Sequence, residues 1–489
     1  MNSNLIKRIA AKVMVDYQRL SIVNNPDGLL TQETVRSLLF QNYRVEVIVG
    51  SNLQLRIHFE LIFKVNSDRR FLYVSEDITS ILPDMRQQAY VCTFNISDAF
   101  PLFADKSLLR GLPFEVLDKL YPLTTTRRVT MSECSFLVER LIVEREQELK
   151  QSADYCLARL RNIEVDWTKP QSMMETISSI TIDAVKNGVY HQIIPGIDAI
   201  NHSFQKWVDE NYFATLQSNH LIHPKSVNKI LPHLVIQHDR EDKVALLVVD
   251  GFTYWQYTIL RQFLETKGVK TEDGTTLSWL PSITMLSRQA IFRGGVPQPD
   301  YKQNPTNEGK LWMDYWKQQG FGSHELQYIS DKDEFAINEG VKRLAVVTVE
   351  MDEKMHSSTD NKDLLSLTEN WCPRITEKIM AILRLGYHLY LTTDHGSVLS
   401  YGWRPLTQIE SVFLYKDGSR GKRHLIYNNK DEQTRFYKEN KDLSLLNHDN
   451  WIAIRDDSCF AREGSAMITH GGSHFTEVVI PFVKLKIDK

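Results

Sequence analysis

Three short apolar runs in the second half of the chain are each followed by an aspartate. The runs are Lys243–Val249, Arg343–Val349 and His388–Thr392. They consist mainly of β-branched and other apolar residues, which is typical of parallel strands buried on both faces. An aspartate lies within three residues of the end of each run. The pattern predicts a sheet whose strands end beside carboxylates.

Helical spacing of apolar residues predicts the connections between these strands. Tyr254–Thr266 follows the first run, and Pro373–Leu385 precedes the third, with Gly386 just beyond its end. The order strand, helix, strand implies right-handed crossovers, which bring the carboxyl ends of parallel strands to one edge of the sheet. Open α/β folds bind ligands at that edge. We therefore expect three carboxylates to meet there, those of Asp250, Asp352 and Asp394.

Histidines accompany these carboxylates. His356 lies four residues after Asp352, His395 is adjacent to Asp394, and His470 lies in a Thr-His-Gly-Gly turn. Taken singly, an aspartate after a strand is more often a helix cap or a turn residue than a ligand. Together, however, three Asp and three His in one predicted sheet domain are the ligand inventory of two divalent metals. The coincidence favours a paired metal site.

A hydroxyl that such metals could activate lies in the segment Pro281–Arg288. Ser287–Phe292 reads as a short helix, which places Thr284 at or near a helix N-terminus. Free backbone N–H groups and the helix dipole favour an anion there, such as a phosphoryl group. The alternative is that Thr284 caps the helix, and taken alone this is the better explanation. With the metal ligands, the segment points to metal-assisted phosphoryl chemistry.

The order of these segments resembles that of the alkaline phosphatase superfamily. Their amino-acid sequences are similar to those of its PglZ branch, known from BREX-type phage defence. The likeness covers about Asp242 to Lys489. It is carried by Pro281–Arg288, Ala290–Gly295, Leu311–Trp316 and Glu477–Phe482, and a weaker likeness is seen at Asn25–Leu30 and Asp98–Pro101. The resemblance implies an alkaline-phosphatase-like, mainly parallel sheet flanked by helices.

The resemblance also implies roles for single residues. Thr284 would be the nucleophile. One metal would be held by Asp250, Asp394 and His395, and the other by Asp352, His356 and His470, with His474 as an alternative to His470. No cysteine is among these ligands, so the expected cofactors are two divalent ions, Zn²⁺ or Mn²⁺.

Basic residues near the nucleophile are candidates for phosphate binding. Arg288 and Arg293 follow Thr284 in the predicted helix, although either could instead pair within that helix. A further basic run is Ser419–His424. We interpret it mainly as a solvated hairpin turn between Ser411–Tyr415 and His424–Tyr427, or else as a contact for a polyanionic substrate at the mouth of the site.

The front of the chain is less informative. Residues 1–105 alternate between helical and extended pieces and are predicted to form a small Rossmann-like α/β module, without a glycine-rich phosphate loop. Residues 106–235 read as a helical linker domain that includes Ser135–Arg161 and Phe204–Leu216. Residues 236–489 form the predicted catalytic domain.

Composition and charge limit the compartment and the partners that we expect for this protein. The 489 residues carry a net charge of −3, so there is no overall electrostatic drive toward nucleic acid. No apolar run reaches the roughly 18 residues of a membrane span, and the start of the chain lacks a signal-peptide core. Five scattered cysteines are typical of reduced thiols. We expect a cytoplasmic protein with no membrane contact.

The function expected from these observations is a metal-dependent phosphodiesterase or phosphatase. Its substrate would be a phosphate ester such as a nucleotide, a cyclic oligonucleotide or nucleic acid. The resemblance implies antiphage defence, with other defence-system proteins as partners. The alternative, from a different class, is a non-catalytic docking subunit of a multi-protein defence complex.

Overall fold

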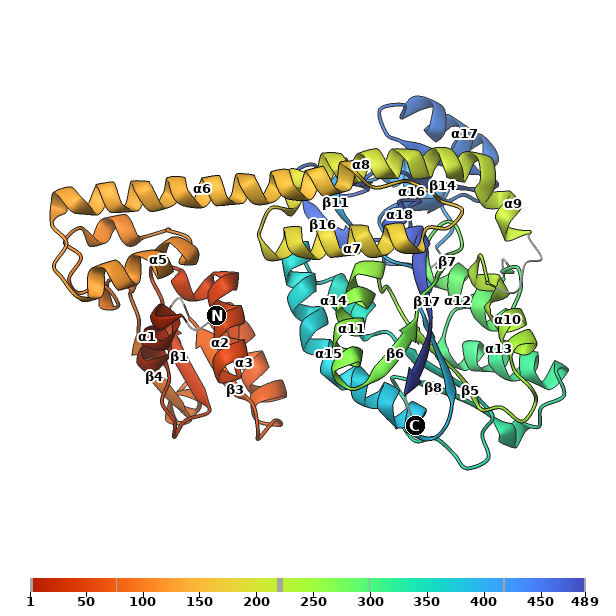
Figure 1. Ribbon diagram of the computed structural model, residues 1–489, viewed down its shortest axis with the longest axis horizontal. Coiled ribbons are helices and arrows are strands. Elements are labelled where there is room, and N and C mark those ends of the chain that lie inside the picture. The colour runs from red at the N-terminus through yellow and green to blue at the C-terminus, as the bar shows by residue number, and fades with distance from the viewer. Residues whose placement is uncertain (1–2, 76, 218–222, 299, 417, 488–489) are drawn as a thin grey trace. The chain divides into compact units, whose positions relative to one another are not determined.

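The computed structural model describes residues 3–75, 77–217, 223–298, 300–416 and 418–487. It falls into two compact units, Met1–Gln151 and Ser152–Lys489. The division lies within the 31-residue helix α6, Met131–Arg161 (Figure 1). The three-part division at residues 105 and 235 stays a prediction. Both units mix helices with parallel strands, so the predicted α/β class is confirmed.

The first unit contains a parallel four-stranded sheet in the order β2-β3-β1-β4. Apolar side chains alternate between the two faces of the sheet and pack against helices on both sides. The strands are β1 Leu20–Asn24, β2 Val45–Val49, β3 Arg70–Val74 and β4 Ala89–Thr93. The helices are α1 Asn4–Val13, α2 Glu33–Tyr43, α3 Asn52–His58, α4 Pro83–Gln87 and α5 Phe114–Thr125.

The second unit is built on a seven-stranded sheet in the order β6-β17-β10-β5-β9-β8, with β7 also paired to β17. Strands β10, β5, β9 and β8 are parallel, and β17 runs antiparallel to β10. The strands are β5 Val244–Val249, β6 Val269–Glu272, β7 Thr275–Leu277, β8 Leu326–Ser330, β9 Arg343–Thr348, β10 His388–Thr392 and β17 Val479–Ile487. The three predicted strands are thus confirmed, and they are neighbours.

Helices cover this sheet (Figure 1). One face packs against α10, α12 and α13, whose apolar side chains meet those of β5 and β9. Helix α11 packs against α7 and α15. The helices are α7 Gln171–Lys186, α8 Tyr190–Trp207, α9 Phe213–Leu216, α10 Ile230–Gln237, α11 Tyr254–Thr266, α12 Thr284–Arg293, α13 Pro305–Gln318, α14 Glu350–Met355 and α15 Asn361–Arg384. The predicted bounds of α11 are confirmed.

Three predicted helices begin too late. Helix α6 starts at Met131, four residues before the predicted Ser135. Helix α15 starts at Asn361 and contains Pro373 in its interior, because the Asp360 side chain caps it and buried apolar residues continue upstream of the proline. Helix α12 starts at Thr284, three residues before the predicted Ser287. The predicted Phe204–Leu216 helix is divided among α8, a π-helical turn over Val208–Tyr212, and α9.

A smaller region follows β10. It holds two three-stranded sheets, β15-β11-β16 and β12-β14-β13. The strands are β11 Val398–Gly402, β12 His424–Ile426, β13 Leu445–His448, β14 Trp451–Ile454, β15 Ser458–Cys459 and β16 Ala466–Thr469, and the helices are α16 Gln408–Val412, α17 Lys430–Glu439 and α18 Phe475–Val478.

The predicted hairpin around the basic run is wrong. Ser411 belongs to helix α16, and the pairing with the following strand is reduced to a single bridge between Leu414 and Tyr427. Arg423 is not solvated but fully buried, because its guanidinium pairs with the buried carboxylate of Glu477. The basic run is therefore not one continuous solvated patch.

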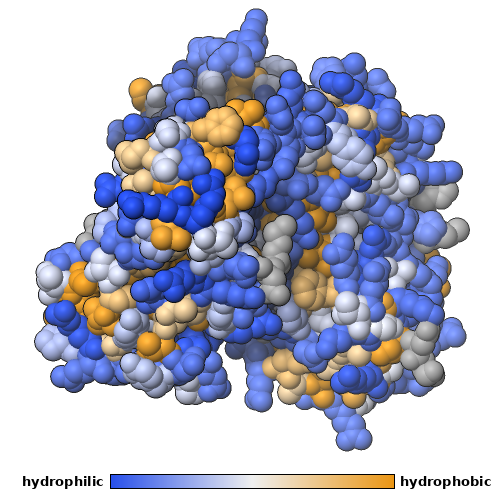
Figure 2. Space-filling view, turned by 60° about the vertical axis from the view of Figure 1, so that its left-hand side comes forward, coloured by the Kyte–Doolittle hydropathy of each residue, from blue (hydrophilic) through white to orange (hydrophobic). Residues whose placement is uncertain are grey.

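The surface view in Figure 2 shows a mostly hydrophilic face with separate apolar patches. Among the helices of the described residues, none combines the length and the apolar character that crossing a membrane requires.

Candidate metal and nucleophile site

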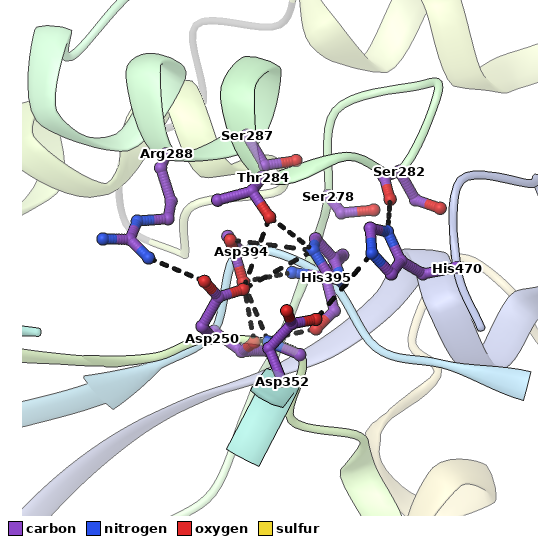
Figure 3. A network of polar contacts seen from close by, with 12 residues as sticks. Asp250, Ser278, Ser282, Thr284, Ser287, Arg288, Asp352, Asp394, His395 and His470 are labelled. Carbon is purple, nitrogen blue, oxygen red and sulfur yellow. Dashed lines mark hydrogen bonds and ion pairs between the residues drawn. The ribbon is translucent and has the colours of Figure 1, made fainter. Parts of the chain in front are cut away.

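The carboxyl ends of three adjacent parallel strands converge on one site (Figure 3). Asp250 directly follows β5, and Asp394 follows β10 after one residue. Asp352 lies in α14, the short helix after β9. The expected meeting of the three carboxylates is therefore observed, and neighbouring segments add the histidines.

The first ligand group consists of Asp250, Asp394 and His395, whose candidate ligand atoms lie within 4.8 Å of one another. All three side chains are buried. His395 Nε2 lies 3.6 Å from Asp250 Oδ1 and 3.8 Å from Asp394 Oδ2. His395 Nδ1 lies 3.0 Å from the carbonyl oxygen of Gly396, to which its N–H donates. This hydrogen bond leaves the Nε2 lone pair facing the two carboxylates.

The second ligand group consists of Asp352, His356 and His470. Asp352 Oδ1 lies 3.4 Å from His356 Nε2 and 3.8 Å from His470 Nε2. His470 Nδ1 lies 3.0 Å from the carbonyl oxygen of Ser282, which orients its ring as Gly396 orients that of His395. The His395 and His470 rings stack with centroids 4.0 Å apart. The two ligand groups are therefore adjacent.

Thr284 lies beside the first ligand group. Its Oγ1 is 3.1 Å from His395 Nε2 and 3.5 Å from Asp250 Oδ1. The N-cap position of α12 is occupied by Ile283, which makes no side-chain capping bond, and Thr284 is the first helical residue. The capping alternative is therefore wrong, and the hydroxyl points toward the carboxylates and the imidazole (Figure 3).

The donor atoms fit divalent ions. Three of them, Asp352 Oδ1, His356 Nε2 and Asp394 Oδ2, are buried without a directed hydrogen bond to any described residue. A buried polar atom left without a partner costs about 1–3 kcal/mol, so three such atoms within one site would be expensive. A cation in each ligand group would provide the missing interaction. Carboxylate and imidazole donors suit zinc and manganese.

The raised pKa values of two of the three carboxylates also favour a bound cation. Burial, together with the charges of Asp394 and Asp352, raises the pKa of Asp250 well above its usual value. Burial raises the pKa of Asp394 to about 6. Burial also acts to raise the pKa of Asp352, but its interaction with His356 and the charges of His470 and His395 outweigh it and lower that pKa. Positive charge at this site would relieve the repulsion among the carboxylates.

Comparison with known proteins agrees with this geometry. The family model described as the BREX system PglZ alkaline phosphatase-like domain matches residues 228–485. The chain belongs to the PglZ family. This confirms the resemblance drawn from the sequence. The match covers both ligand groups and the central sheet of the second unit, except for the last two residues of β17.

Solved structures similar to the PglZ domain are distant. Murine ectonucleotide pyrophosphatase / phosphodiesterase 5 shows 10% identity and a TM-score of 0.34 over 50% of this chain and 88% of that chain. Phosphonoacetate hydrolase from Sinorhizobium meliloti shows 8% identity and a TM-score of 0.33 over 50% of this chain and 89% of that chain. No match to a curated protein was found.

Arg288 of the PglZ domain is held differently from the expected substrate contact. It is 2% exposed, and its Nη1 donates to Asp250 Oδ2 at 2.8 Å. Nε and Nη2 donate to the two carboxylate oxygens of Glu308 at 3.0 and 2.9 Å. With both sides of its guanidinium occupied by carboxylates, Arg288 orients Asp250. Arg293 is the last residue of α12, roughly 13 Å along the helix from Thr284.

The loop that carries His470 is fixed by two residues to which no role was assigned from the sequence, Ser282 and Glu477. Glu477 Oε1 accepts the Gly472 N–H at 2.8 Å, and the Ser282 hydroxyl donates to the Gly472 carbonyl at 2.9 Å. His474, the alternative ligand, belongs to neither ligand group. It caps α18 instead, since its Nδ1 accepts the Thr476 N–H at 3.3 Å.

Gly251 allows β9 and β5 to deliver their carboxylates side by side. Its φ of 68° is in the left-handed region. A Cβ at this position would lie 3.1 Å from the Cβ and from Oδ1 of Asp352. The turn after Asp250 therefore brings backbone close to the second ligand group, which only glycine permits without displacement.

Proposed function

We propose that this PglZ protein is a metal-dependent phosphoester hydrolase with Thr284 as its nucleophile. The observation that carries the proposal is the position of the Thr284 hydroxyl, at a helix N-terminus and 3.1 Å from His395 Nε2 in a buried ligand group. A hydroxyl in contact with candidate metal ligands is the arrangement that metal-assisted nucleophilic catalysis requires. The proposed substrates are nucleotides, cyclic oligonucleotides or nucleic acid.

The site residues would have the following roles. Asp250, Asp394 and His395 would hold one ion, and Asp352, His356 and His470 would hold the other. Two divalent ions, Zn²⁺ or Mn²⁺, would supply positive charge at the attacking and leaving oxygens of an in-line displacement. Thr284 Oγ1 attacks phosphorus, forming the P–O bond to the enzyme as the ester oxygen leaves. Water then cleaves the phosphothreonine and releases phosphate or a monoester.

The backbone of α12 contributes to binding of the transferred group. Thr284 is its first residue, so the unpaired N–H groups of the first turn lie next to the nucleophile. These groups and the helix dipole favour a phosphoryl oxygen. This role does not depend on Arg288, which is already paired with carboxylates.

Thr284→Ala tests the nucleophile. We expect turnover of a bis-aryl phosphate reporter to fall by at least about 10³-fold, while both ions remain bound, because the substitution removes the attacking oxygen and leaves the six ligands in place. Thr284→Ser is the matched control, since it keeps a hydroxyl at the same position and should retain measurable turnover. Wild-type turnover in Thr284→Ala would exclude Thr284 as the nucleophile.

The second candidate function is a docking subunit. It is favoured by the family description, which places PglZ in the BREX system and so suggests defence-system partners and a cytoplasmic, antiphage role. Asp352→Asn and His356→Ala should lower turnover by several orders of magnitude, because both side chains are ligands of one ion. Phage resistance is then measured in cells that contain the variants at normal levels. Loss of resistance supports the enzyme, and full resistance supports the docking subunit.

A further inference from the structure

The amino ends of β5 and β10 carry a separate cluster of metal-binding residue types. His238 is the residue that ends α10, Asp242 lies in the turn before β5, and His388 is the first residue of β10. Candidate ligand atoms of the three residues lie within 4.8 Å of one another. Strands β5 and β10 pair in parallel, with His388 opposite Val244. The cluster is therefore at the sheet edge opposite Asp250 and Asp394, roughly 20 Å along the same two strands.

Neighbouring groups hold two of these side chains in position. His238 Nε2 lies 2.8 Å from the Tyr390 hydroxyl, and this contact turns His238 Nδ1 toward Asp242 Oδ2, 3.4 Å away. The same carboxylate oxygen accepts the Asp239 N–H at 3.0 Å. Metal-binding histidines commonly have the second ring nitrogen held in this way, which fixes the ring and leaves the other nitrogen for the ion.

His388 completes the cluster from the solvent side. Its ring centroid lies 4.7 Å from that of His238, and its side chain is exposed. An ion between these groups would have two imidazoles and one carboxylate from the protein, and access to water for a fourth position. Four ligands of these types match tetrahedral zinc, whereas magnesium and calcium prefer oxygen ligands.

We propose that His238, Asp242 and His388 bind one Zn²⁺ ion, separate from the catalytic site. The ion would join the end of α10 and the turn before β5 to the first residue of β10. Because it would connect these three segments, its role would be to stabilise the sheet. The proposal uses no residue of the catalytic site and stands independently of the proposed function.

Two nearby positive charges oppose binding. Lys484 on β17 is opposite Tyr390, and its ammonium lies 5.5 Å from the centre of the Tyr390 ring. Lys486, two residues further along β17, also acts on His388. Ammonium groups at a solvent-facing edge are screened by water and salt, so they lower the affinity without removing the ligands. We expect the site to bind less tightly than the buried catalytic groups.

Counting bound ions tests the proposal in the full-length protein. Dialysis against micromolar Zn²⁺, followed by elemental analysis, should give one fewer ion per chain for His388→Gln and for His238→Gln than for the wild type. Tyr390→Phe should keep the site but weaken it by about 10–100-fold, because it removes only the orienting hydroxyl. His202→Gln is the matched control, since His202 is an exposed histidine on α8 and outside the cluster.

The outcomes separate this site from the catalytic one. Asp352→Asn should lose one ion and still bind the ion of the His238 cluster, and zinc should still raise its melting temperature by a few degrees. An ion count that is the same in the wild type, His238→Gln and His388→Gln would overturn the proposal. The three residues would then form only a hydrogen-bonded histidine–aspartate pair with a neighbouring imidazole.

Discussion

The two ligand groups of the PglZ domain are built on different supports. Asp250, Asp394 and His395 closely follow central strands and are all buried. Asp352 lies in the six-residue helix α14 and His356 directly follows it, and their side chains are 14% and 15% exposed. The first group is therefore preformed by the sheet, whereas the second depends on a short helix and on the loop of His470.

The partners around each group reinforce this difference. Asp394 Oδ1 accepts the N–H groups of Gly251 and His395, at 3.2 and 3.0 Å, and Arg288 holds Asp250. In the second group, Asp352 Oδ1 and His356 Nε2 have no directed hydrogen bond to a described residue. Under the proposed mechanism, the rigid group would hold the ion beside Thr284, and the more adaptable group would hold the ion beside a substrate oxygen.

The largest expected effect is a loss of turnover, and the ion that is lost with it distinguishes the two ligand groups. Asp394→Asn should remove the ion of the first group and Asp352→Asn that of the second, and each variant should lose turnover by several orders of magnitude. Elemental analysis of each variant should show that only one of these two ions is lost. Loss of both ions from either variant would mean that the groups do not bind independently.

A smaller effect is expected from Glu308, which touches no ligand atom but holds Arg288. Glu308→Gln should lower the affinity of the first group by about 10–100-fold and leave the second unchanged, because it weakens the orientation of Asp250 through Arg288. Metal titration of the variant measures this. Glu325→Gln is the matched control, since Glu325 is also nearly buried and pairs with an arginine, Arg240, at 3.0 Å. Equal affinity in both variants would show that Arg288 does not support the first group.

The smallest effect concerns the backbone between the groups. Gly251→Ala should lower the free energy of unfolding by about 1–3 kcal/mol and weaken the second group, because the added Cβ is strained at this φ and presses on Asp352. Gly268→Ala shares the left-handed backbone, with a φ of 76°, but its Cβ meets nothing within 4 Å. Denaturant unfolding and metal titration compare the two. Weaker metal binding in Gly251→Ala alone would identify the contact with Asp352 as the cause.

Helices and strands with a regular spacing of apolar residues were predictable from the sequence. The bounds of α11 and β10 and the approximate bounds of β5 and β9 follow from apolar spacing, because strands and helices buried on a sheet require it. The late start predicted for α15 shows the limit of such signals. Pro373 is a typical first-turn residue, yet here it lies inside a helix whose beginning is set by Asp360 and by packing.

The sequence by itself determined which residues can meet at the site. Parallel strands in right-handed connection end at one edge, so residues that follow such strands converge wherever the chain folds this way. It also placed Thr284 near a helix N-terminus. Only the tertiary structure decided that Glu308 holds Arg288, that Ser282 and Glu477 fix the His470 loop, and that His474 is a cap. The Arg288–Glu308 and Ser282–Glu477 contacts join residues 20 and 195 apart in the sequence. Their geometry depends on how whole elements pack, which no local pattern records.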